Sequence, residues 1–181
     1  MNGLAAIPTL ETPRLRLRPH RLEDFPAYAA MWADPNVIRY IGGVPFPREA
    51  AWSRFLRHAG MWHFLGFGGF VFEDKATGAF AGEGGFHDFR RALEPSLEGS
   101  MEAGWVLASA WHGRGLAEEA MRPALDWAAE HGTGPRLTCM IHTEHAASLH
   151  VAGKLGFAEF ARSTYHGSPM VLLDRPRQAK A

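Results

Sequence analysis

A turn with two glycines at residues 112–117 carries the clearest chemical signal in the sequence. It reads His-Gly-Arg-Gly-Leu-Ala, and it separates an apolar segment ending at Leu107 from a segment with helical spacing. Gly113 and Gly115 allow positive backbone dihedral angles that expose successive N–H groups, and the start of the following helix adds the positive end of its dipole. The turn therefore predicts an anion cradle suited to phosphate, although a tight glycine-capped connection would have the same sequence.

Two well-known nucleotide-binding loops do not match this turn. A P-loop ends in Gly-Lys-Ser/Thr, which the turn lacks, and a dinucleotide-binding fingerprint requires glycine or alanine where Glu118 stands. Any phosphate bound at residues 113–117 is therefore expected to belong to a different class of ligand.

Composition limits the classes of function. The 181 residues, 46% hydrophobic and 21% charged, predict one globular domain over residues 1–181, with loose ends at 1–12 and 176–181. Lys plus Arg and Asp plus Glu both total 19, so the net charge of +0 argues against a general affinity for nucleic acid or an anionic membrane. The single cysteine, the lack of an 18-residue apolar run and the lack of a signal-type start favour a cytoplasmic location.

Periodicity predicts the elements that must position the turn. Period-two alternation or short apolar runs indicate strands, and spacing of three to four residues indicates helices. The strands are expected at 14–18, 67–72, 79–86, 101–107, 136–142, 158–164 and 170–173. The helices are expected from 22 to 33, after Pro47, from 116 to about 131 and from 146 to 155. Residues 87–99 show no periodicity and are expected to form a surface loop.

Three separated motifs resemble the GNAT acetyltransferase superfamily. The turn is similar to its acyl-CoA pyrophosphate loop, Gln/Arg-x-x-Gly-x-Gly/Ala, with His112 in the first position. The aromatic-led start of the turn at Trp111 and the upstream motif Asp34-Pro35-x-Val37-x-Arg39-Tyr40 resemble the ribosomal-protein N-terminal acetyltransferase (RimJ/RimL-type) branch. The downstream motif Ser148-x-x-Val151-x-x-Lys154-Leu155-Gly156-Phe157 resembles the second signature of the superfamily. The resemblance covers nearly the whole chain. It implies an α/β fold whose mixed, mainly antiparallel twisted sheet is flanked by helices.

The same resemblance implies a site for acetyl-CoA in the cleft where strand 101–107 parts from strand 136–142. Backbone N–H groups at Val106 and Leu107 would face the pantetheine arm and the thioester carbonyl. The pyrophosphate would be bound by residues of the loop, namely His112, Gly113, Arg114, Gly115, Leu116 and Ala117. Arg114 is alternatively a solvent-exposed charge. His145 stands where the family has asparagine, so either its imidazole N–H replaces the amide or that contact is missing.

Acyl transfer to an amine requires a base, stabilisation of an oxyanion and a proton for the departing thiolate. By resemblance, Glu102 is the expected base, and its alternative role is that of a salt-bridged carboxylate in a strand. Ser148 is expected to protonate the leaving sulfur, and its alternative is a local backbone hydrogen bond. Tyr165 is a more distant candidate acid. Cys139 has no evident paired base, so direct transfer in a ternary complex is expected, without a covalent enzyme intermediate.

Other clusters give weaker predictions. His142, His145 and His150 with Glu144 fit no known metal-ligand spacing, so no native metal is expected. Five aromatic residues could line an acceptor pocket, but helical spacing favours core packing for them: Trp32, Trp52, Trp62, Phe64 and Phe67. The expected partners are acetyl-CoA and an amine, either a protein N-terminus or a small molecule, with the chain a monomer or a homodimer. A catalytically silent acyl-CoA-binding or sensing domain is the alternative.

Overall fold

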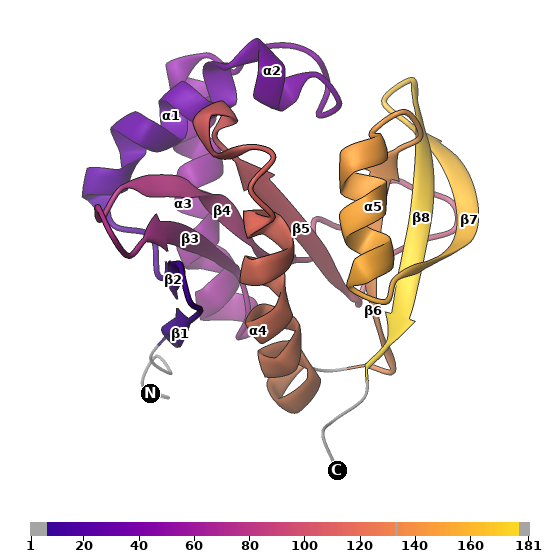
Figure 1. The fold of residues 1–181 in the computed structure, drawn as a ribbon. Helices are drawn as coiled ribbons and strands as arrows, with labels where there is room; N and C mark the ends of the chain where they lie inside the picture. Colours follow the sequence, from indigo (N-terminus) through magenta and orange to yellow (C-terminus); the bar gives the residue numbers. More distant parts are fainter. Residues whose placement is uncertain (1–6, 133, 178–181) are drawn as a thin grey trace.

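The computed structural model describes residues 7–132 and 134–177, which form an eight-stranded sheet flanked by helices (Figure 1). The strands lie in the order β1-β2-β3-β4-β5-β6-β8-β7, and every neighbouring pair is antiparallel except β5 and β6. Their bounds are β1 (Leu10–Glu11), β2 (Leu15–Arg18), β3 (Gly69–Asp74), β4 (Phe80–His87), β5 (Met101–Leu107), β6 (Arg136–His142), β7 (Ala158–Tyr165) and β8 (Ser168–Pro176). The expected mixed, mainly antiparallel sheet is confirmed.

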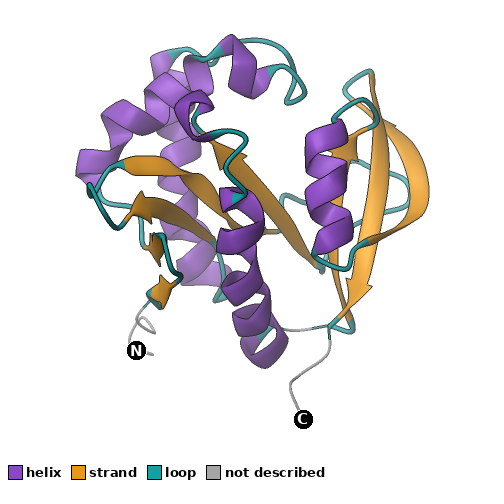
Figure 2. Cartoon of the chain, viewed as in Figure 1, coloured by secondary structure: helices purple, strands orange, loops and turns teal. Residues whose placement is uncertain are grey.

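Five α-helices accompany the sheet (Figure 2), and their ends follow from the local sequence. Their bounds are α1 (Phe25–Ala33), α2 (Pro35–Ile38), α3 (Arg48–Leu65), α4 (Leu116–His131) and α5 (Ala146–Lys154). Asp34 ends α1 and begins α2, because its carboxylate accepts a hydrogen bond from the Asn36 N–H. Gly66 ends α3 in the left-handed conformation, at φ 73°. None of the helices in the described ranges combines the length and apolar composition needed to cross a bilayer.

The helices cover both faces of the sheet. Glu83 on β4 contacts His58 of α3, whereas Phe86, three positions along the same strand, stacks on Trp127 of α4. Since side chains alternate along a strand, α3 and α4 lie on opposite faces, with α4 in front in Figure 1. Val106 of β5, the cross-strand partner of Glu83, packs against the apolar cluster of α1, α2 and α3.

The two halves of the sheet meet along a short parallel contact. β5 pairs with β6 at only two positions, Met101 with Leu137 and Glu102 with Thr138. Past this point β5 stays paired with β4 as far as Leu107, and β6 stays paired with β8 as far as His142. The carboxyl-terminal halves of β5 and β6 therefore diverge, which confirms the expected parting of the two strands.

The expected loose segment at residues 1–12 extends less far than predicted. Leu10–Glu11 forms β1 against β2, and the hydroxyl of the buried Thr12 donates a hydrogen bond to Glu119 at 2.7 Å. At the other end, β8 continues to Pro176. The remaining residues of the two predicted loose ends, 1–6 and 178–181, lie outside the described residues.

Candidate active site

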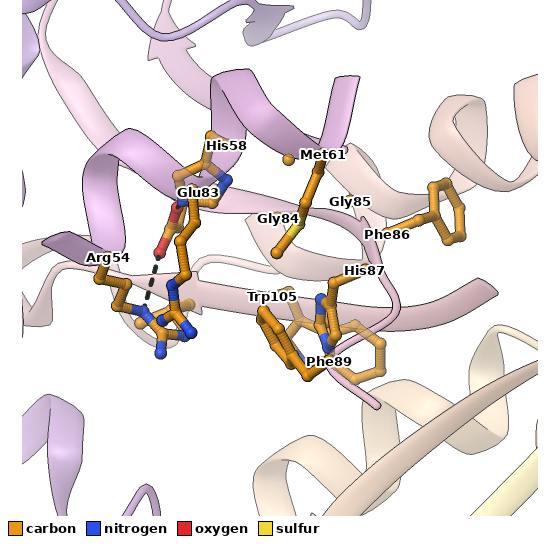
Figure 3. Close-up of a pocket in the computed structure, with 14 residues that line it drawn as sticks. Arg54, His58, Met61, Glu83, Gly84, Gly85, Phe86, His87, Phe89 and Trp105 are labelled. Carbon is orange, nitrogen blue, oxygen red and sulfur yellow. Dashed lines mark ion pairs between the residues drawn. The ribbon is translucent and has the colours of Figure 1, made fainter. Parts of the chain in front are cut away.

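The divergence of β5 and β6 opens a cavity of about 620 Å³. Side chains from α3, from the loop after β4 and from the start of α5 complete its wall. A second pocket of about 60 Å³ adjoins it on the α3 side and shares part of its lining, including Arg54, His87 and Phe89 (Figure 3). The lining therefore comes from the α3 side of the sheet, from the start of α5 and from the strands beside it.

The glycine turn has the backbone conformation that the sequence predicts. Gly113 and Gly115 have φ angles of 72° and 74°, in the left-handed region that favours glycine, and α4 begins directly afterwards at Leu116. Leu116 is buried, so only its backbone is available to a ligand, whereas Arg114 is exposed and lies over the Trp111 ring. The turn thus presents N–H groups to solvent, together with the Arg114 guanidinium, which makes no ion pair among the described residues.

Two carboxylates in the first turn of α4 are each held by cations. Glu119 pairs with Arg14 at 2.6 Å, and Glu118 pairs with Arg122 at 2.5 Å and with Lys154 at 3.2 Å. Burial opposes ionisation of Glu119, but its bonds to Thr12 and Arg14 lower its pKa. Since their charge is compensated, these carboxylates leave the positive end of the helix dipole available to an anion.

The end of β5 determines which N–H groups reach the cleft. The Ala108 N–H donates to Ala81 O on β4 at 3.0 Å, and alternate residues of an antiparallel strand point to opposite neighbours. By this alternation the N–H of Leu107 points into the cleft and that of Val106 points to β4. The Val106 N–H therefore does not reach the cleft, contrary to the expectation from the sequence. The side chain of Val106 faces α1 and α3. His112 Nε2 lies 2.8 Å from Leu107 O and ties the turn to the strand.

Glu102 is a salt-bridged carboxylate, which was the alternative interpretation of this residue. Arg91 donates two hydrogen bonds to it, each 3.0 Å long, and His87 Nε2 lies 3.1 Å from Oε1. Burial opposes ionisation of the carboxyl group, but His87 and Arg91 outweigh it and lower the pKa of Glu102 to about 2. A carboxylate with so low a pKa is a poor proton acceptor, so the geometry gives Glu102 little capacity as a general base.

We predict that Glu102→Gln destabilises the fold by about 3 kcal/mol at pH 7, because the substitution leaves Arg91 buried without its partner. The folded-state pKa lies below the ordinary value of 4.5, so the ionic contribution is complete above pH 4.5 and is lost as pH falls toward 2. Urea unfolding between pH 7 and pH 3 measures this loss as a shrinking difference between the two proteins. The exposed Glu98→Gln is the control, and an equal, small effect of both substitutions would contradict the prediction.

His87 is the imidazole that Glu102 orients, and the sequence interpretation missed it. It lines both pockets, stacks on Phe89 with ring centroids 4.2 Å apart and packs over Gly104, where an added Cβ would lie 2.8 Å from the imidazole Cε1. Because Glu102 lies at Nε2, Nδ1 is the ring nitrogen left for a substrate. His87 pairs with Glu102 across β4 and β5, but the sequence does not specify the register of these strands and so provides no signal for this pairing.

The other side of the cleft is formed by the start of α5. Ser148 lines the cavity, and within the described part of the chain its hydroxyl has no hydrogen-bond partner, contrary to the alternative of a local backbone bond. His145 also lines the cavity and stacks on Tyr40 with ring centroids 4.6 Å apart. Burial and the neighbouring His112 and His142 lower the pKa of His145, so its ring is neutral at pH 7. Tyr165 lines the same cavity.

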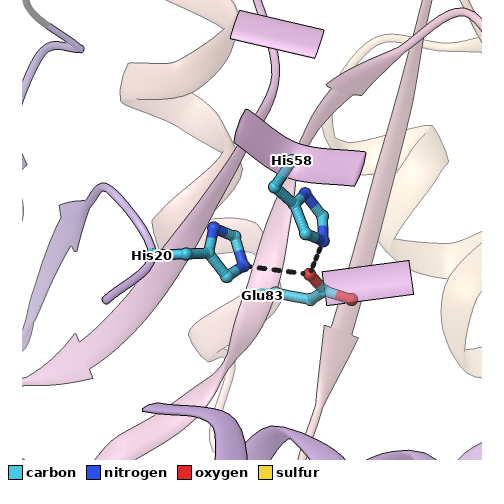
Figure 4. Close-up of side chains that lie close together, drawn as sticks. All are labelled: His20, His58 and Glu83. Carbon is cyan, nitrogen blue, oxygen red and sulfur yellow. Dashed lines mark hydrogen bonds and ion pairs between the residues drawn. The ribbon is translucent and has the colours of Figure 1, made fainter. Parts of the chain in front are cut away.

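A histidine cluster does form, but from other residues than those the sequence suggests. Ligand atoms of His20, His58 and Glu83 lie within 4.8 Å of one another (Figure 4). The two imidazole rings stack at 4.0 Å with an interplanar angle of 11°. A metal lies in the plane of each imidazole that binds it, and two stacked, nearly parallel rings share no such plane. In this arrangement the cluster holds a buried carboxylate rather than a cation.

The bonds to Glu83 show what this cluster does instead. Oε2 lies 3.2 Å from His20 Nε2 and 2.7 Å from His58 Nε2, and Trp32 donates to Oε1 at 3.0 Å. Burial opposes ionisation, but the two histidines hold the pKa of Glu83 well below its usual range. The cluster therefore fixes α1 and α3 to β4.

Cys139 is buried as expected, and burial raises the pKa of its thiol.

Together, the sheet with two diverging strands, the glycine turn before α4 and the open cleft are those of an α/β acyltransferase. Residues 14–158 match the family described as acetyltransferase (GNAT) domain, and the chain belongs to this family. A GNAT-family acetyltransferase from Bordetella pertussis is 31% identical, with a TM-score of 0.82 over 93% of this chain and 99% of that one. The YkkB protein of Bacillus subtilis (strain 168) is 28% identical over 151 residues, which cover 81% of this chain and 83% of that protein.

The fold is also that of a ribosomal-protein acetyltransferase. RimL, the ribosomal L7/L12 alpha-N-protein acetyltransferase, was solved in complex with coenzyme A. It superimposes with a TM-score of 0.74 over 96% of this chain and 100% of that one, at 15% identity. This similarity agrees with the branch that the motifs resemble. At 15% identity it shows a likeness of fold alone.

Proposed function

We propose that the protein transfers the acetyl group of acetyl-CoA to a primary amine, on a protein N-terminus or a small molecule, in a ternary complex. The observation that carries the proposal is the pair of left-handed glycines, Gly113 and Gly115, which open onto α4 beside the cleft between β5 and β6. Nothing lies within 4 Å of a Cβ added at Gly113, so on that side a pyrophosphate can approach the backbone. The coenzyme A bound to RimL, which shares this fold, supports the same ligand class.

The chain supplies binding groups along the whole length of the donor. N–H groups of residues 113–117 and the exposed Arg114 are suited to the phosphates. The Leu107 N–H faces the cleft, where it can bind the thioester oxygen as negative charge develops on it. His145 occupies the position at which its neutral imidazole can contact the pantetheine arm. Acetyl-CoA supplies the activated acyl group.

We assign the removal of the amine proton to His87. The amine nitrogen attacks the thioester carbon, the carbon–sulfur bond breaks, and the proton lost by the amine passes to His87 Nδ1. Glu102, expected from the sequence to be the base, acts through His87 as a positioning residue. Ser148 supplies a proton to the departing sulfur and regains one from solvent, which agrees with its unpartnered hydroxyl within the described chain.

The test is calorimetric titration with coenzyme A and acetyl-CoA, followed by a screen of primary amines monitored by release of free thiol. We expect affinity for both donors and rapid thiol release with at least one amine. Binding without thiol release for any amine would favour the non-catalytic acyl-CoA-binding or sensing domain. Absence of binding by the folded protein would overturn the proposal altogether.

A further inference from the structure

Guanidinium groups from two separate segments converge on the cleft. Arg54 and Arg57 come from α3, Arg91 comes from the loop after β4, and all three line the 620 Å³ cavity. Among the described residues, the only carboxylate in this lining is Glu102. Figure 3 shows Arg54 reaching toward the pocket from α3. The cavity therefore carries an excess of positive charge although the whole chain has a net charge of +0.

Two of these three arginines lack a close ionic partner. Arg91 is neutralised by its two hydrogen bonds to Glu102. Arg54 reaches Glu83 only at 4.0 Å, and its buried Nε has no hydrogen-bond partner. Within residues 7–132 and 134–177, Arg57 makes no ion pair, and its guanidinium lies over the Phe89 ring at 5.0 Å. Arg57 is exposed, so an incoming anion can reach its guanidinium, and partial desolvation and the neighbouring Arg54 lower its pKa.

The position of these arginines separates them from the phosphate turn. α3 covers the face of the sheet that carries Glu83, and α4, which begins at the turn, covers the opposite face (Figure 1). An anion bound at Arg57 is therefore a different group from the pyrophosphate of the donor. The group that enters the cleft from the α3 side is the acceptor.

We infer that the acceptor amine carries a carboxylate, which Arg57 binds with the help of Arg54. This inference rests on the proposed acetyl transfer. A guanidinium binds a carboxylate through two parallel hydrogen bonds, so the pair fixes orientation as well as charge. The positive potential also lowers the pKa of the acceptor ammonium, which favours the neutral nucleophile. A polyamine would place further cations beside Arg54 and Arg57 and is selected against.

The aromatic lining indicates the rest of the acceptor. Phe89 and Trp105 line both pockets next to the arginines, and they offer apolar contact to a carbon skeleton. An amine with an apolar or aromatic side chain and one carboxylate, such as an amino acid, matches this combination. The charge and shape of such an amine determine which compounds are tested as acceptors.

The experiment compares amines that carry a carboxylate with amines in which it is an amide, each at the same concentration of the neutral amine. Phenylalanine and phenylalaninamide form one pair, glutamate and glutamine form a second, and spermidine is the polycation. With acetyl-CoA saturating, we expect kcat/KM for phenylalanine to exceed that for its amide by about tenfold or more, because the amide leaves the guanidiniums unpaired. The glutamate pair then shows whether a side-chain carboxylate adds to the effect.

Substitutions test whether Arg57 is the source of this preference. Arg57→Gln is expected to reduce the preference for the carboxylate to about twofold or less, and Arg57→Lys, which keeps the charge, to restore part of it. Arg48→Gln is the matched control, because Arg48 lies on the same helix but outside both pockets. The control is expected to keep the full preference.

A binding measurement keeps this inference separate from the proposed reaction. N-acetyl-L-phenylalanine and its carboxamide are titrated into the coenzyme A-loaded protein, so that no turnover is required. We expect the free acid to bind more tightly in the unsubstituted protein and this difference to disappear in Arg57→Gln. Equal binding of both compounds would overturn the acidic acceptor. Selective binding of the acid without transfer to any amine would instead overturn the proposed reaction.

Discussion

Gly115→Val is expected to weaken coenzyme A binding by about 100-fold or more. Gly115 has a φ angle of 74°, which a β-branched residue adopts only under strain, and it directly precedes the first residue of α4. Space is not the limiting factor, because an added Cβ would meet only Arg14 Nη2, at 3.9 Å. The loss instead follows from rotation of the N–H groups that we propose bind the phosphates. Calorimetric titration with coenzyme A measures the change.

Gly78→Val is the matched control for this substitution. Gly78 also has a positive φ angle, 72°, and nothing lies within 4 Å of its added Cβ, but it lies in the turn between β3 and β4. Both substitutions should therefore cost similar conformational stability, while only the one at Gly115 changes affinity. Unaltered coenzyme A binding by folded Gly115→Val protein would contradict the placement of the phosphates at this turn.

The parts of the fold that follow from local sequence could be predicted. The positive φ angles at Gly113 and Gly115, the hairpin of β3 and β4, and α5 ending before Gly156 depend on residues close together in the chain. The divergence of β5 from β6 could be expected only through resemblance to a family. In the structure it results from pairing with β4 and β8, which is a property of the assembled sheet.

The candidate site was harder to predict because its partners are distant in sequence. Glu102 was correctly placed in a strand, but its pKa is set by His87 across the sheet and by Arg91 in a loop without periodicity. That loop is held in place by Leu93 and Leu97, which are buried in a cluster with Leu172 of β8. The cluster of His20, His58 and Glu83 was not predicted for the same reason, because its residues are distant in sequence. A single sequence contains no pattern that joins such residues.

His87→Gln is expected to lower kcat by about 100- to 1000-fold, because a general base contributes by this amount, with little change in coenzyme A affinity, because the proposed donor site lies on the other face of the sheet. An imidazole must be neutral to accept a proton, so activity that depends on His87 is lost once its ring is protonated. A base at Glu102, with a pKa of about 2, would remain ionised throughout the range from pH 5 to 8. The dependence of kcat on pH between 5 and 8 therefore distinguishes the two assignments.

The comparison of His87→Gln with Glu102→Gln separates base from positioning residue. If Glu102 only orients the imidazole, its substitution lowers kcat less than that of His87 and leaves kcat dependent on pH. His63→Gln is the control, since His63 is an exposed histidine of α3 that lines neither pocket. Near-normal kcat in His87→Gln with a large loss in Glu102→Gln would return the base role to the carboxylate. Equal losses with flat pH profiles would assign deprotonation to neither residue.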